Sequence, residues 1–158
     1  MREQQELQQG LQQLGLDAQS SRVLALLPLI MVAWADGRVQ VQEQREIERL
    51  ADDIGLVDTK RSRQVLRRWL ARPLERAEQH IGLHVLRQLA QNDDSSRWSQ
   101  DSLEALVGLC YQVANASGSL LGLTSNISAA ERNVIEDIAA KLSVTDVGVW
   151  QRLYGLQR

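Results

Sequence analysis

Three acidic residues, Asp36, Glu43 and Glu46, are spaced in this chain so that they could hold a cation. Glu43 and Glu46 lie three residues apart, which places them on one face of a helix, and Asp36 could fold back towards them across a turn at Gly37. Carboxylates that meet repel one another, and a divalent cation relieves that repulsion. Their oxygen atoms favour Ca²⁺, Mg²⁺ or Mn²⁺ over Zn²⁺. The pattern therefore predicts a divalent-cation site at these three acids.

The site cannot be an EF-hand. If Gly37 were the glycine at the sixth position of a calcium loop, Val32 and Trp34 would occupy the first and third positions. Neither side chain carries an oxygen, whereas Ca²⁺ needs about six to eight oxygen ligands. A looser arrangement of the acids is the form of site that remains.

A second charged segment, "KRSRQVLRRWLAR" at 60–72, holds six basic residues and no acid: Lys60, Arg61, Arg63, Arg67, Arg68 and Arg72. On a helix its apolar residues would face inwards, and the basic ones would spread over the remaining surface. That surface could contact an acidic protein or an anionic membrane, or it could simply be solvated. The chain has a net charge of −2 and only Trp69 nearby to stack on bases, so nucleic acid is the least favoured partner.

Residues that could support catalysis are few. His80 and His84 have a spacing that can bind Zn²⁺, but no glutamate lies between them and no third ligand is evident, which favours a surface pair. Cys110 falls on an apolar stripe and is expected to be a buried thiol. No phosphate-binding glycine-rich loop is present. The sequence predicts a protein that is not an enzyme.

Helices must position all of these residues. Leu, Ala, Gln, Glu and Arg dominate the chain, which has two prolines and no phenylalanine. Apolar residues recur at helical spacing almost throughout, and no segment alternates for long enough to predict a strand. We expect an all-α compact bundle of about seven to eight helices, with a polar helical arm at 1–16 and a single domain at 17–158.

Prolines and glycines indicate where these helices begin and end. Pro28 falls inside an apolar segment and predicts a kink or a break. Pro73 suits the first turn of a helix. Gly15 and Gly55 should each end a helix, and a short last helix is expected around Trp150.

The most apolar stretch, "VLALLPLIMVAWA", has about 13 residues, fewer than the roughly 20 that span a bilayer, so it predicts a core helix and no transmembrane segment. The start of the chain is polar and Gln-rich, unlike a secretion signal. A single cysteine suits a reducing compartment. These features predict a cytoplasmic protein.

A weak internal two-fold repeat is also visible. "VAWADGRV" at 32–39 returns as "VANASGSL" at 113–120, and "EQREIERLADDIGL" matches "ERNVIEDIAAKLSV". The alignment pairs Glu43 with Glu131 and matches the predicted turn glycines Gly37 and Gly118.

The repeat leaves open a structural explanation of the acids. Ser128 and Glu131 have the spacing of a capping box, in which the glutamate bonds back to the helix start. Glu43 would then be the equivalent cap of its own helix, and Glu46 would complement the helix dipole. Both the cation site and the capping role remain possible explanations of Glu43.

The segment "LLPLIMVAWADGRVQVQEQREIERLADDIGL", followed by a second such copy, resembles the tellurite-resistance TerB-like family over roughly residues 22–145. The resemblance implies a compact helical bundle with a negatively charged patch that binds a metal ion. It also implies a link to stress or tellurite response near the membrane, without an established enzyme activity. Ser117 departs from the pattern, which favours aspartate there and so weakens any second acidic site.

These inferences together predict a non-catalytic TerB-like stress-response module. It would bind a divalent cation at Asp36, Glu43 and Glu46 and act through other, membrane-associated proteins. The alternative is a metal-independent adaptor that binds an acidic protein or a membrane surface through the basic helix at 60–72.

Overall fold

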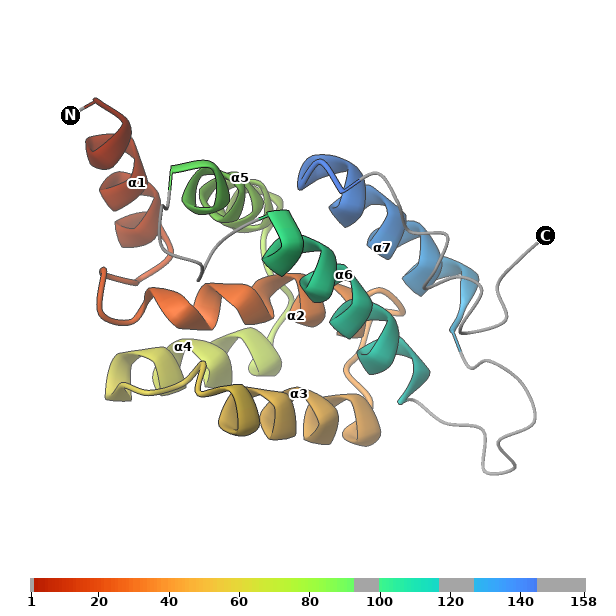
Figure 1. Ribbon diagram of the computed structural model, residues 1–158. Coiled ribbons are helices and arrows are strands. Elements are labelled where there is room, and N and C mark those ends of the chain that lie inside the picture. Colours follow the sequence, from red (N-terminus) through yellow and green to blue (C-terminus); the bar gives the residue numbers. More distant parts are fainter. Residues whose placement is uncertain (1, 93–99, 117–126, 145–158) are drawn as a thin grey trace.

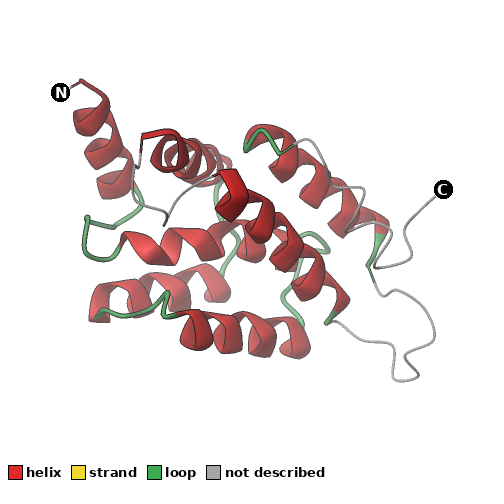
Figure 2. Ribbon diagram, in the orientation of Figure 1, coloured by secondary structure: helices red, strands yellow, loops and turns green. Residues whose placement is uncertain are grey.

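Helices account for the regular structure, as the spacing of apolar residues predicts. The structure, a computed structural model, describes residues 2–92, 100–116 and 127–144. These ranges hold no strand (Figures 1 and 2). Their helices are α1 (Arg2–Gln13), the 3₁₀ helix η1 (Ser21–Leu26), α2 (Leu27–Ala33), α3 (Val41–Ile54), α4 (Lys60–Ala71), α5 (Arg76–Asn92), α6 (Gln100–Asn115) and α7 (Ala129–Lys141).

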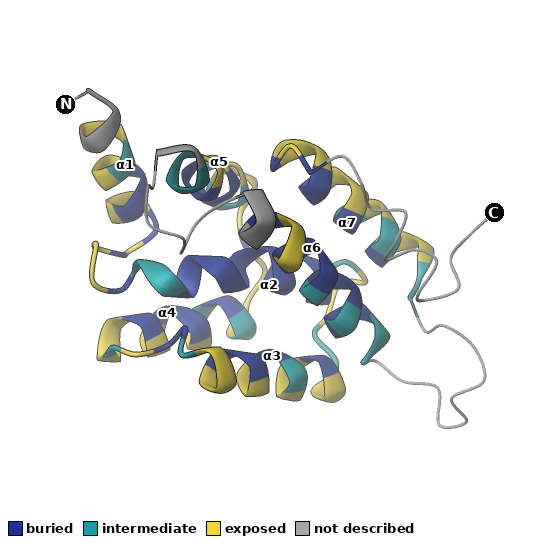
Figure 3. Ribbon diagram, in the orientation of Figure 1, coloured by how far each residue is buried: buried dark blue, intermediate teal, exposed yellow. Residues whose placement is uncertain are grey.

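Helix α2 is the centre of the bundle. Every one of its residues is buried, and it contacts η1 and each of the helices α3 to α7. It crosses the middle of the molecule in Figure 1 and is dark blue along its length in Figure 3. Burial of a large apolar side chain contributes about 1.5–3 kcal/mol, so this short segment stabilises the whole bundle. In the described ranges, no helix is both long enough and apolar enough to cross a membrane.

Pro28 lies at the start of a helix, whereas Pro73 follows the end of one. The break expected at Pro28 is present just before it, because η1 ends at Leu26 and Pro28 lies in the first turn of α2. A first-turn residue needs no amide hydrogen for the helix. The prediction for Pro73 is wrong, since α5 begins only at Arg76. Arg72, immediately before this proline, is extended, which is the conformation that a following proline favours.

The predicted N-terminal arm contributes to the common core. Leu11, Leu14 and Leu16 are buried, and α1 packs on α5. At Gly10 an added Cβ would lie 2.6 Å from Cγ2 of Val85, so a larger residue there would push the two helices apart. The apolar side of the arm is therefore continuous with the rest of the bundle.

The predicted end of α3 is confirmed at Gly55, which has a left-handed backbone with φ of 75°. Two other sequence predictions, the turn at Gly118 and the short helix around Trp150, lie outside the described residues.

Candidate functional site

Helices α3 and α7 begin at the same end of the molecule, on the right of Figure 1, and each carries a buried glutamate in its first turn. Glu43 is 2% exposed and Glu131 is 1% exposed. Oε1 of Glu43 accepts a hydrogen bond from the Gln40 amide at 3.1 Å, and Oε1 of Glu131 accepts one from the Ser128 amide at 3.0 Å. Both glutamates thus satisfy amides that a helix start leaves unpaired.

The two buried carboxyl groups also interact with each other. Burial, followed by the side-chain contact with Glu131, raises the pKa of Glu43 from 4.5 to about 8, and Asp36 adds repulsion. The buried Oε2 atom of Glu131 has no hydrogen-bond partner among the described residues. A proton held between the two glutamates removes one of the facing charges. The pair therefore carries one proton at neutral pH.

Asp36 joins this pair from the loop between α2 and α3. Gly37 has a φ of 89°, a left-handed conformation that turns the chain directly after Asp36. The Ser128 hydroxyl donates to Oδ1 of Asp36 at 3.2 Å, and its oxygen accepts from the Glu131 amide at 3.1 Å. Ser128 thus links this loop to the start of α7. We call Asp36, Glu43, Ser128 and Glu131 the acidic junction.

Glu46 has partners of its own. Its carboxylate pairs with Arg49 and accepts from Nε2 of Gln112 at 2.7 Å. The hydrogen bond from Arg49, supported by that from Gln112, holds the pKa of Glu46 below its usual value. The structure therefore brings Asp36 and Glu43 together and engages Glu46 elsewhere.

Glu131 is the acid that the sequence prediction of the cation site left out. Its alignment with Glu43 was the available signal, because equivalent positions of two packed copies can meet. Across the described ranges, no group of three or more His, Cys, Asp or Glu side chains is arranged to hold a metal ion. The metal-binding role stays a prediction.

The basic residues of α4 do not form one free surface. Arg61 pairs with Asp17 at 3.4 Å, and Arg63 lies 3.9 Å from Asp52. Nη2 of the half-buried Arg68 donates to the carbonyl oxygen of Leu14 at 3.0 Å. The other three basic residues are exposed and pair with no described acid: Lys60, Arg67 and Arg72.

The remaining candidates from the sequence lie apart from the junction. Cys110 is fully buried, and burial raises the pKa of its thiol, which keeps it protonated and poorly nucleophilic. His80 and His84 are exposed and line a groove between α5 and α7.

No protein-family model, curated protein or solved structure matches the chain.

Proposed function

We propose that the chain is a non-catalytic, TerB-like stress-response module that binds a divalent cation at the acidic junction and acts through other proteins. The observation that carries this proposal is the buried Glu43–Glu131 pair with the unpartnered Oε2 of Glu131. A buried polar atom left without a partner costs about 1–3 kcal/mol, so such atoms usually have a role. In the cation-free protein a proton shared with Glu43 would satisfy Oε2 of Glu131. In the cation-bound protein the cation would satisfy it.

Cation binding at this place is an exchange of the shared proton for an ion. Asp36, Glu43 and Glu131 would supply the carboxylate oxygens, with water completing the shell of a hard cation. No described basic side chain pairs with Glu43 or Glu131, so among the described residues the negative charge left by deprotonation has no counter-ion. The proton keeps the carboxyl groups together in the cation-free protein, and the exposed Asp36 is the ligand able to move.

Partner binding would follow from the position of the acidic junction. It joins the loop after α2 to the start of α7, so an ion would hold two parts of the surface in a fixed relation. Val41, at the first residue of α3, is 61% exposed and offers an apolar contact beside the acidic junction. The partner would thus recognise the cation-bound form.

The test is titration of Ca²⁺, Mg²⁺, Mn²⁺ and Zn²⁺ into metal-stripped protein, followed by calorimetry and thermal unfolding. An ion at about 100 times its Kd stabilises the folded state by about 2.7 kcal/mol. Binding should be tighter at pH 9 than at pH 6, because the proton competes for the same oxygens. Glu131→Gln should lose the response and Glu48→Gln, an exposed acid of α3, should keep it. Absence of heat and of stabilisation by every ion at pH 9 contradicts the proposal.

The adaptor alternative rests on a separate observation: Lys60, Arg67 and Arg72, on or beside α4, are exposed and pair with no acid that the structure describes. It predicts binding to acidic peptides or anionic vesicles that a chelator leaves unchanged and that Arg67→Gln weakens. Both functions would operate in the cytoplasm.

A further inference from the structure

A groove between α5 and α7 gathers positive charge away from the acidic junction. Its volume is about 210 Å³, and the described residues that line it are His80, Leu83, His84, Arg87, Ala140 and Lys141. Four of these six side chains are basic or imidazole groups, and none is acidic. Because the whole chain has a net charge of −2, this concentration does not follow from composition. We call it the basic groove.

The described residues neutralise only part of the charge of the basic groove. Lys141 pairs with Asp137 at 3.1 Å, one turn back on α7. Among the described residues, no acid pairs with Arg87, and neither histidine makes a hydrogen bond. Lys141 also complements the carboxyl end of its helix. Among the described residues, Arg87, His80 and His84 are therefore the side chains whose donors no protein group is shown to occupy.

We propose that the basic groove binds a phosphate group, either inorganic phosphate or the terminal phosphate of a small monoester. Arginine offers a planar fork of N–H donors that fits phosphate oxygens, lysine adds a point charge, and each imidazole adds an N–H donor. These donors come from two helices and from three successive turns of α5. A phosphate group, with several charged oxygens, can engage more of them at once than a carboxylate can.

The size of the basic groove supports a small group. Pockets for drug-sized ligands measure about 300–1,000 Å³, and one water takes about 30 Å³, so 210 Å³ suits a single phosphate with some water. The basic side chains are exposed, so the rest of a monoester would extend into solvent. The basic groove would thus bind the same phosphate group whether the ligand is inorganic phosphate or a small monoester.

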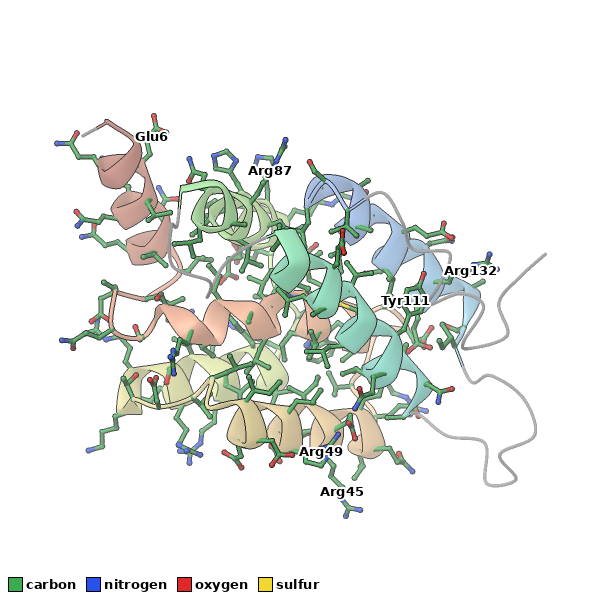
Figure 4. The ribbon with its side chains drawn as sticks, in the orientation of Figure 1. Glu6, Arg45, Arg49, Arg87, Tyr111 and Arg132 are labelled. Atoms are coloured by element: carbon green, nitrogen blue, oxygen red, sulfur yellow. The ribbon has the colours of Figure 1, made fainter. Side chains whose placement is uncertain are left out.

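The test is an NMR titration of the full ¹⁵N-labelled chain with sodium phosphate at constant ionic strength. Saturable shifts are expected for residues of α5 and of the end of α7. Arg87→Gln should weaken binding about tenfold or more, the usual effect of losing a hydrogen bond to a charged group. The matched control is Arg45→Gln, an exposed arginine of α3 that lies on the opposite side of the molecule from Arg87 in Figure 4 and should bind as the wild type does.

Glycerol phosphate distinguishes the two sources. Tighter binding than that of inorganic phosphate assigns the basic groove to a monoester, and equal binding assigns it to the free ion. Unsaturable shifts that acetate reproduces would overturn the proposal, as would wild-type affinity in Arg87→Gln. His84→Gln, expected to weaken phosphate binding as well, is a second variant that decides the matter if Arg87→Gln fails to fold.

Discussion

Helix α7 carries opposite charges at its two ends, and the two ends differ in what surrounds those charges. Glu131, in its first turn, belongs to the acidic junction, and Lys141, its last residue, lines the basic groove about 15 Å further along the helix. Both charges suit the helix dipole, which favours acids at the start and bases at the end.

Burial is the difference between them. Glu131 is 1% exposed and meets Glu43, whereas Lys141 and its neighbours His84 and Arg87 are exposed. A buried charge must be neutralised inside the protein, so its protonation is coupled to folding. An exposed charge keeps its water and remains available to a ligand. The comparison predicts that changes at the acidic junction alter stability and that changes at the basic groove alter binding only.

The largest effect is expected from Glu43→Gln. The folded pKa of Glu43, about 8, is raised above the ordinary 4.5, so the folded state holds the extra proton between these values. Its stabilising contribution is complete below pH 4.5 and is lost as the pH rises through 8. The free energy of unfolding should fall by at most about 1.4 kcal/mol per pH unit in that window. In Glu43→Gln the amide donates without titrating, so the slope should largely vanish in urea unfolding from pH 5 to pH 8.

The matched control for that slope is Glu48→Gln, an exposed acid on the same helix, which should unfold with the wild-type pH dependence. A wild-type protein whose stability is constant between pH 5 and pH 8 would show that the two glutamates share no proton.

A smaller loss is expected from Ser128→Ala. This change removes the oxygen that accepts from the Glu131 amide and the hydroxyl that donates to Asp36. Loss of a capping side chain costs about 0.5–2 kcal/mol. Asp36→Ala removes only the exposed hydrogen bond between Asp36 and the Ser128 hydroxyl, and it should cost a few tenths of a kcal/mol. Equal losses in the two variants, measured by urea unfolding at pH 7, would assign the effect to the loop contact instead of the cap.

Much of the fold could be predicted because its signals are local. Apolar spacing gives the helices, the break precedes Pro28, and Gly55 ends α3. The prediction for Pro73 was wrong because the backbone angle that proline favours suits the first turn of a helix. It suits the extended residues that precede a helix equally well.

The candidate site was harder to predict because its contacts join distant parts of the chain. Helix spacing places Glu43 and Glu46 on one face, but it cannot show that Arg49 and Gln112 hold Glu46. Nor can it show that Glu131 packs against Glu43, since that depends on how α3 and α7 meet. Similarly, the run of bases in α4 gives no sign that Arg68 reaches the carbonyl of Leu14.

The difference between a charged side chain that is hydrogen-bonded within the protein and one that is exposed can be tested within α4 as well. Arg68→Ala removes a half-buried guanidinium that ties α4 to the end of α1, which should cost about 1–2 kcal/mol through the lost hydrogen bond and packing. Arg67→Ala, at an exposed neighbour that pairs with no described acid, should change stability by less than about 0.5 kcal/mol. Chemical denaturation of both variants makes the comparison, and an equal cost would mean that Arg68 contributes no more than a surface charge.

The smallest effect on stability is expected at the basic groove. Arg87 has no acidic partner among the described residues and shares its surroundings with three other basic or imidazole groups. Arg87→Gln should therefore leave the free energy of unfolding unchanged or raise it by a few tenths of a kcal/mol, since its positive charge no longer faces that of Lys141. Phosphate should then raise the Tm of the wild type more than that of the variant, because only the wild type retains all four donors. A loss above about 1 kcal/mol in Arg87→Gln would mean that this arginine is structural, as Glu131 is, and the contrast between the two ends of α7 would not hold.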